Sequence, residues 1–95
     1  MFPSLISLRL SGLLLTAAVS PSREVVEAAY HIPSLDRYLD YVSVMSYDYH
    51  GHWDKRTGHV APMYGDQETD RSGNREFNVN FTVHHWLAGG LRRSK

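Results

Sequence analysis

Apolar and polar positions follow two different spacings along the chain. Residues 13–20 (LLLTAAVS) form a continuous run of apolar and small residues between Gly12 and Pro21, which is typical of a strand buried on both faces. Residues 41–46 (YVSVMS) are rich in β-branched and aromatic side chains and predict a second strand. Neither run alternates strictly, so both favour a parallel sheet that is covered on two faces.

Three segments have apolar residues at helical spacing. Residues 22–30 (SREVVEAAY) predict a short helix whose first residue, a serine, can act as its N-cap. Pro33 then interrupts the chain, and Ser34 is expected to cap a second short helix. Residues 78–88 fit both a strand and a helix, but their length and the double glycine that follows them favour a helix.

The order of these elements is a β/α pattern with parallel strands. Residues 49–74 are rich in Gly, Asp, His and Thr and have little periodicity, which predicts a long loop of the kind that often carries function. Residues 91–95 are expected to form a frayed tail. Two strands cannot complete such a sheet, so we expect its remaining strands to come from outside these 95 residues.

Composition excludes several classes of protein and partner. The chain carries ten basic and ten acidic side chains with no basic stripe, so we expect no nucleic-acid partner. It has no cysteine, which rules out disulfides and cysteine-based zinc sites. Hydrophobic residues make up 42% and charged residues 21%, the range of globular domains. The apolar run is too short to span a membrane, and no membrane partner is expected.

The run at residues 13–19 has an alternative interpretation as the core of a secretory signal peptide. Arg9, the one early charge, lies next to the run rather than at the start of the chain. A cut after Ser20 would leave Pro21 at the cleavage point. These features favour a buried strand, and the sequence has no convincing signal peptide.

The densest polar chemistry directly follows the second strand. Residues 47–53 (YDYHGHW) bring together phenol, carboxylate, imidazole and indole groups. Asp48, His50 and His52 alternate, so on an extended segment they would face one side and could hold zinc or iron. The competing interpretation is that these are ordinary loop histidines. We favour it and therefore expect neither a metal ion nor a cofactor. Trp53 in a loop is typical of an exposed binding aromatic.

The residues resemble consecutive pieces of a known catalytic domain. LLLTAAVS, AAYHIPSLDRYLDYVSVMSYDYHGHWD, TGHVAPMYG and FNVNFTVHHWLAGG, in this order and spacing, are similar to family-18 glycoside hydrolases, the animal-type chitinases. The resemblance runs over residues 12–90. It implies an α/β fold, a fragment of a TIM (β/α)8 barrel, in which residues 13–20 are the fifth strand and residues 41–47 the sixth. Residues 1–11 are then unassigned or a remnant of the preceding helix, and residues 91–95 are a tail.

The resemblance also implies roles for four residues at the end of the sixth strand. Family-18 enzymes hydrolyse β-1,4-linked N-acetylglucosamine polymers with the substrate's own acetamido oxygen as the attacking group, an exception to the two-carboxylate scheme. By position, Tyr47 resembles the tyrosine that hydrogen-bonds this oxygen, and Asp48 resembles the acid that contacts the sugar in the same subsite. Met45 resembles the thioether on the floor of that subsite. Trp53 resembles the indole that stacks on a sugar ring.

The sequence departs from the family at the general acid. The family's acid ends a D-x-x-D-x-D-x-E motif, which these 95 residues lack; GDQETD, with Asp66, Glu68 and Asp70, is the nearest pattern. We therefore expect a chitinase-like fragment that is inactive alone. The alternative is a catalytically dead, lectin-like relative that binds chitin or oligosaccharides.

Further expectations follow from the same resemblance. It implies that chitin or N-acetylglucosamine oligosaccharides are the partners and that the parent protein is extracellular. Asn80 begins an Asn-Phe-Thr triplet, a candidate glycosylation site that falls inside the predicted helix at residues 78–88.

Overall fold

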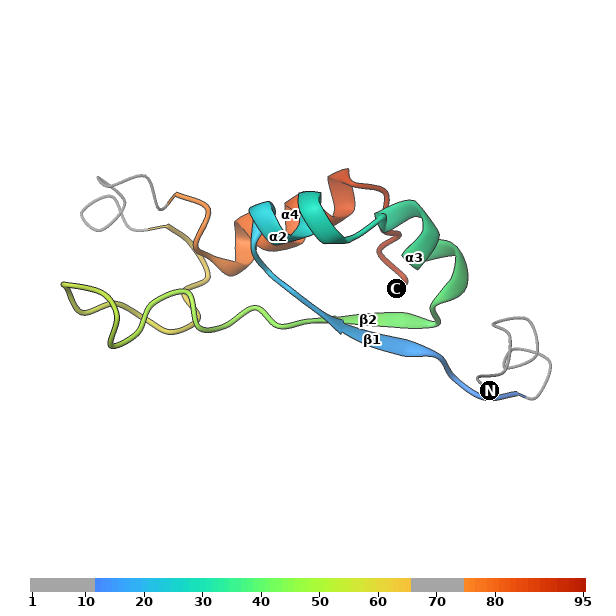
Figure 1. Ribbon diagram of the computed structural model, residues 1–95, viewed down its shortest axis with the longest axis horizontal. Coiled ribbons are helices and arrows are strands. Elements are labelled where there is room, and N and C mark those ends of the chain that lie inside the picture. The colour runs from blue at the N-terminus through green and yellow to red at the C-terminus, as the bar shows by residue number, and fades with distance from the viewer. Residues whose placement is uncertain (1–11, 66–74) are drawn as a thin grey trace.

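The computed structural model describes residues 12–65 and 75–95, which form a two-stranded sheet and three helices (Figure 1). In chain order the elements are β1 (Thr16–Val19), α2 (Arg23–Ala29), α3 (Ile32–Tyr38), β2 (Tyr41–Val44) and α4 (Val79–Ala88). Both predicted strands and all three predicted helices are present, although each strand is shorter than the sequence indicates. The prediction for residues 1–11 lies outside the described residues.

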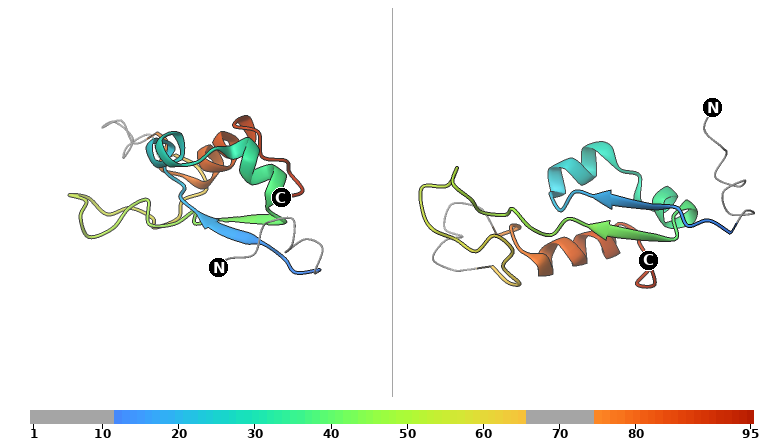
Figure 2. Two further views of the ribbon diagram at one scale, coloured as in Figure 1. Left: turned by 45° about the vertical axis from the view of Figure 1, so that its right-hand side comes forward. Right: turned by 90° about the horizontal axis from the view of Figure 1, so that it is seen from below.

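The two strands pair in parallel, as the sequence predicts. Ala17 lies opposite Val42, and Val19 lies opposite Val44; these four side chains pack toward the helices. Figures 1 and 2 show that all three helices lie on this one side of the sheet. The intervening strand positions are exposed. Within the described residues the helices therefore cover one face of the sheet, and coverage of the other face by parts of the sheet outside these 95 residues stays a prediction.

The hydrophobic core is small and is centred on Trp86 of α4. Trp86 is 1% exposed and packs in one cluster with Val19, Val26 and Ile32, which come from β1, α2 and α3. Its indole N–H donates a 3.1 Å hydrogen bond to the carbonyl of Ser20. This one side chain therefore fixes α4 against both helices and across the end of β1.

Two predicted helix starts are wrong in detail. Ser22 stands at the N-cap of α2, but its side chain makes no capping hydrogen bond. α3 begins at Ile32, so that Pro33 lies inside its first turn rather than before the helix. Proline is tolerated there because amides of the first turn have no helical acceptor. The hydroxyl of Ser34 lies 2.6 Å from Nδ1 of His31, the true N-cap residue.

The C-terminal residues are bound to the domain, so the predicted frayed tail is wrong. Arg92 donates from its backbone N–H to Asp36 Oδ1 (2.8 Å) and from Nε to Asp36 Oδ2 (2.9 Å). The backbone hydrogen bond is the main reason that the pKa of Asp36 is lowered. Lys95 donates from Nζ to the carbonyl of Leu39 (2.6 Å), and its own carbonyl accepts from the amide of Val42 (2.8 Å).

Residues 49–65 contain no helix or strand, which confirms the described part of the predicted loop. The acidic pattern at residues 66–70 lies outside the described residues. No helix in the described ranges is long and apolar enough to cross a membrane.

Candidate functional site

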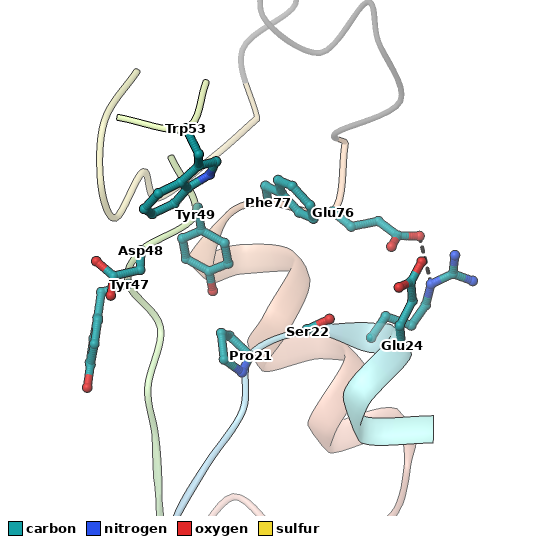
Figure 3. Close-up of a pocket in the computed structure, with 10 residues that line it drawn as sticks. Pro21, Ser22, Glu24, Tyr47, Asp48, Tyr49, Trp53, Glu76 and Phe77 are labelled. Carbon is teal, nitrogen blue, oxygen red and sulfur yellow. Dashed lines mark ion pairs between the residues drawn. The ribbon is translucent and has the colours of Figure 1, made fainter. Parts of the chain in front are cut away.

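A pocket of about 290 Å³ opens at the carboxyl ends of β1 and β2 (Figure 3). Because parallel strands end at the same edge of a sheet, the segments that follow them meet there. Three residues predicted from the sequence, Tyr47, Asp48 and Trp53, are brought together in this pocket. Met45 is half-buried and is not among the lining residues. The full lining consists of Pro21, Ser22, Arg23, Glu24, Tyr47, Asp48, Tyr49, Trp53, Glu76 and Phe77.

The chain leaves β2 through tight turns that aim successive side chains in different directions. The amides of Ser46 and Tyr47 each donate to the carbonyl two residues earlier, at 2.9 and 2.8 Å. Asp48 then adopts a left-handed backbone conformation (φ 57°), which Asp tolerates better than most residues. As a result Tyr47 is 52% exposed at the rim, whereas Tyr49 is 6% exposed. Figure 3 shows the ring of Tyr47 directed away from the aromatic side of the pocket.

A short loop closed by Asp54 holds Trp53 over the pocket. Oδ2 of Asp54 accepts from the amide of Gly51 (3.0 Å) and lies 3.3 Å from Nδ1 of His50. The amide of Asp54 donates back to the carbonyl of Gly51 (3.0 Å). The indole lies directly against Gly51, where a Cβ would overlap its Cη2 and Cζ3 atoms. Trp53 nevertheless remains 57% exposed, so its ring is available to a ligand.

The structure does not bring Asp48, His50 and His52 together as the alternative metal site would require. No three His, Asp or Glu side chains within residues 12–65 and 75–95 are placed to hold a metal ion. His50 faces Asp54, and His52 packs edge-on against Trp53 with ring centroids 5.3 Å apart. The alternating polar positions do not face one side because the left-handed residue and the turns after it break the extended conformation.

The opposite wall of the pocket was not predicted from the sequence. Nε of Arg23, at the start of α2, forms a 2.8 Å ion pair with Oε1 of Glu76, just before α4. Figure 3 shows Glu76 on the far side of the pocket from Tyr47, with Phe77 between. Pro21 and its neighbours directly follow β1, and that position at the carboxyl end of a parallel strand is a sequence feature that could have predicted their place in the pocket. No local signal pointed to Glu76, because its place depends on how α4 docks.

Comparison with known proteins identifies the family. The family model described as "Glycosyl hydrolases family 18" matches residues 4–95. The chain belongs to glycosyl hydrolase family 18. This family-18 chain is 50% identical to Probable chitinase 10 of Drosophila melanogaster over 84 residues. The aligned region covers 88% of this chain and 4% of that protein. The chain is 52% identical over 84 residues to Probable chitinase 2 of the same organism, covering 88% of the chain and 16% of that protein. The resemblance drawn from the sequence is confirmed.

The backbone of the chain is also similar to solved structures of chitinase-type proteins. Ostrinia furnacalis Group II chitinase catalytic domain 2 matches with a TM-score of 0.85 at 49% identity, over 94% of this chain and 22% of that one. Human YKL-39, described as a pseudo-chitinase with retained chitooligosaccharide binding properties, matches with a TM-score of 0.78 at 35% identity, over 84% of this chain and 22% of that one. The chain therefore has the fold of part of a chitinase-type TIM barrel. It spans less than a quarter of the length of these relatives.

The candidate glycosylation residue, Asn80, lies on α4 with its side chain exposed. Thr82 of the same triplet is fully buried. Glycosylation of Asn80 stays a prediction.

Proposed function

We propose that the pocket binds an N-acetylglucosamine unit of a chitin-type oligosaccharide, as part of a family-18 barrel in which β1 and β2 are the fifth and sixth strands. The observation that carries this proposal is the convergence of Tyr47, Asp48 and Trp53 on one pocket at the carboxyl ends of two parallel strands. In TIM barrels the active site lies at that end of the strands. An indole face beside hydroxyl and carboxylate groups suits a pyranose, which has apolar faces and a polar rim.

Each predicted residue has a chemical task in this proposal. The Tyr47 hydroxyl donates a hydrogen bond that holds the acetamido oxygen against the anomeric carbon. The Asp48 carboxylate accepts a hydrogen bond from the same sugar. Trp53 stacks on a neighbouring ring, and Met45 packs beneath the subsite. Tyr47 is 52% exposed at the rim of the pocket, so its hydroxyl is accessible to a ligand.

Hydrolysis also requires a group that protonates the leaving oxygen. The 95 residues contain no D-x-x-D-x-D-x-E motif. We therefore assign to this chain the part of the site that positions the sugar, and expect no hydrolysis by the chain alone. The substrate in this proposal is extracellular chitin or an oligosaccharide derived from it.

A second candidate function is oligosaccharide binding without hydrolysis. It is favoured by one observation: the aromatic and carboxylate residues that would contact a sugar converge on one pocket, and binding there needs no general acid. Human YKL-39, a relative at 35% identity, is described as retaining chitooligosaccharide binding as a pseudo-chitinase. The two candidates share the pocket and differ only in whether turnover follows binding.

The test uses the full chain titrated with N-acetylglucosamine oligomers while tryptophan emission and a circular dichroism melt are recorded. The chain has two tryptophans, of which Trp53 is 57% exposed and Trp86 is 1% exposed. Stacking of a sugar should shift the emission of Trp53 and raise the midpoint of the melt, because ligands that bind only the folded state stabilise it. Trp53→Phe should abolish the emission change. Tyr64→Phe, at a 69% exposed position outside the pocket, is the matched control and should leave it unchanged.

A cooperative melt that oligomers do not shift would contradict the binding proposal. The absence of any cooperative melt would instead show that the pocket forms only with the remaining strands of the barrel. Release of shorter oligomers by the purified chain would contradict the separate expectation that it does not hydrolyse chitin alone.

A further inference from the structure

One buried hydroxyl links the two walls of the pocket. Thr82 of α4 is 0% exposed; its Oγ1 donates to the carbonyl of Pro21 at 3.2 Å and lies 2.6 Å from the hydroxyl oxygen of Tyr49. A threonine hydroxyl has a single proton to donate. Since that proton is directed to Pro21, the Tyr49 hydroxyl must donate to Thr82. The hydrogen-bond chain therefore runs in one direction, from Tyr49 through Thr82 to Pro21.

Both ends of this hydrogen-bond chain belong to segments that line the pocket. Pro21 follows β1, and Tyr49 follows β2 directly after Asp48 (Figure 3). The paired register of the two strands ends at Val19 and Val44. Beyond that point the separation of the two segments depends on contacts such as this one, rather than on the sheet.

A second hydrogen bond prevents α4 from sliding relative to β1. Trp86 lies four residues after Thr82, on the same face of the helix, and its Nε1 donates to the carbonyl of Ser20. Two side chains one turn apart therefore satisfy the consecutive carbonyls of Ser20 and Pro21. With the helix fixed in this way, the Thr82 hydroxyl has a defined position from which to hold Tyr49.

The position of Tyr49 matters because of the residue before it. Asp48 has a φ of 57°, a conformation that is costly for a non-glycine residue and persists only where neighbouring contacts maintain it. Tyr49 is anchored at both ends, by its hydroxyl to Thr82 and by its amide to the carbonyl of Val60 (3.0 Å). Release of the hydroxyl end would let Asp48 relax and would move Tyr47 with it.

We propose that Thr82 is a positioning residue for the sugar pocket: through Tyr49 it holds the acetamido-binding pair, Tyr47 and Asp48, at a fixed distance from the wall at Pro21. The proposal rests on the function proposed above and deepens it. It also gives Thr82 a role in the folded protein that is independent of glycosylation at Asn80.

The test compares Thr82→Val with Thr82→Ser in the full chain. Valine keeps the shape of threonine without the hydroxyl, whereas serine keeps the hydroxyl. Thr82→Val should weaken binding of N-acetylglucosamine oligomers by about tenfold for the folded fraction, and Thr82→Ser should restore it. Ile32→Val is the matched control, because it removes a buried methyl group from α3 and lowers stability without touching the pocket lining.

Amide hydrogen exchange supplies a readout that needs no ligand. In Thr82→Val the amides of Ser22 and Tyr49 should exchange roughly tenfold faster, because their segments are released. The amide of Met45, which donates to the carbonyl of Val19 within the sheet, should be unchanged. A general loss of stability would instead accelerate all three amides together.

The outcomes separate this inference from the proposed function. If the wild-type chain binds oligomers and Thr82→Val binds them as well as Ile32→Val does, the positioning role is overturned and the binding proposal stands. If the wild-type chain melts cooperatively and binds no oligomer, the proposed function fails. The exchange pattern then decides whether Thr82 sets the geometry of the pocket: selective acceleration supports it, and uniform or absent acceleration overturns it.

Discussion

Replacement of Gly51 by alanine tests whether the placement of Trp53 determines sugar binding. The backbone of Gly51 does not have the positive φ that would disfavour alanine, so the substitution acts through space alone. An added Cβ would overlap two indole atoms of Trp53 and approach a third, Cε3, to 2.9 Å. Unstrained carbon contacts lie at roughly 3.5–4.0 Å, so the ring has to withdraw by on the order of 1 Å.

Gly51→Ala should lower the affinity for N-acetylglucosamine oligomers and leave the stability of the fold nearly unchanged. Trp53 is 57% exposed, and its ring can move into solvent, so we expect the free energy of unfolding to change by less than about 0.5 kcal/mol. A well-placed aromatic contact contributes roughly 0.5–1.5 kcal/mol beyond the area it buries. Its loss should weaken oligomer binding by roughly two- to tenfold.

The measurement is a calorimetric titration of Gly51→Ala and wild-type chain with N-acetylglucosamine oligomers, with a urea denaturation of each. Gly89→Ala is the matched control: its Cβ would meet the end of Ile32, remote from the pocket, so stability should change while affinity should not. A folded Gly51→Ala variant with wild-type affinity would refute the idea that Trp53, in the position seen here, is the stacking platform.

Three further predictions concern the elements that carry the site. Asn78→Ala removes the side chain that caps α4 and should lower the free energy of unfolding by about 1 kcal/mol in urea; an unchanged midpoint would contradict the capping role. Trp86→Phe leaves the Ser20 carbonyl without its indole donor and a smaller ring in the core, and should cost about 2–3 kcal/mol by the same assay, so a loss below about 0.5 kcal/mol would contradict its central place. The pKa of Asp36 is lowered in the folded chain, chiefly by the amide of Arg92, so this contact stabilises the fold above the unfolded pKa of about 4 and is lost as the pH falls through the lowered value. Asp36→Asn should therefore flatten the acid side of the stability profile between pH 7 and pH 2, and an unaltered slope would show that the contact does not form.

Local sequence features predict the type of each helix and strand correctly. The strand in residues 41–46 and the helix in residues 78–88 are predicted correctly in type, although β2 ends at Val44, because β-branched side chains and a double glycine after a long apolar segment act within one element. The errors arose at element ends. Pro33 predicts a break in the chain, but in the first turn of α3 its missing amide costs nothing. Residues 91–95 show no local sign of order because the partners of Arg92 and Lys95, Asp36 and Leu39, are more than fifty residues away in sequence.

The candidate site divides in the same way. Tyr47, Asp48 and Trp53 stand close together in the sequence after one strand, and the resemblance to family-18 glycoside hydrolases singles them out by position. The metal hypothesis assumes an extended backbone at Asp48, whereas that residue has a left-handed conformation. Asp tolerates the left-handed conformation better than most residues, but residue type alone does not say which Asp adopts it.

The sequence by itself therefore determined the elements, the parallel order of the strands, the family and one wall of the pocket, because these depend on periodicity and on motifs within short stretches. Only the tertiary structure decided which residues face that wall. Thr82 illustrates the difference: in the sequence it completes a glycosylation triplet, whereas in the fold it joins Tyr49 to Pro21 across 33 and 61 residues. The physical reason is that a buried hydroxyl must find its partners wherever packing of the core places them, and sequence spacing carries no record of those partners.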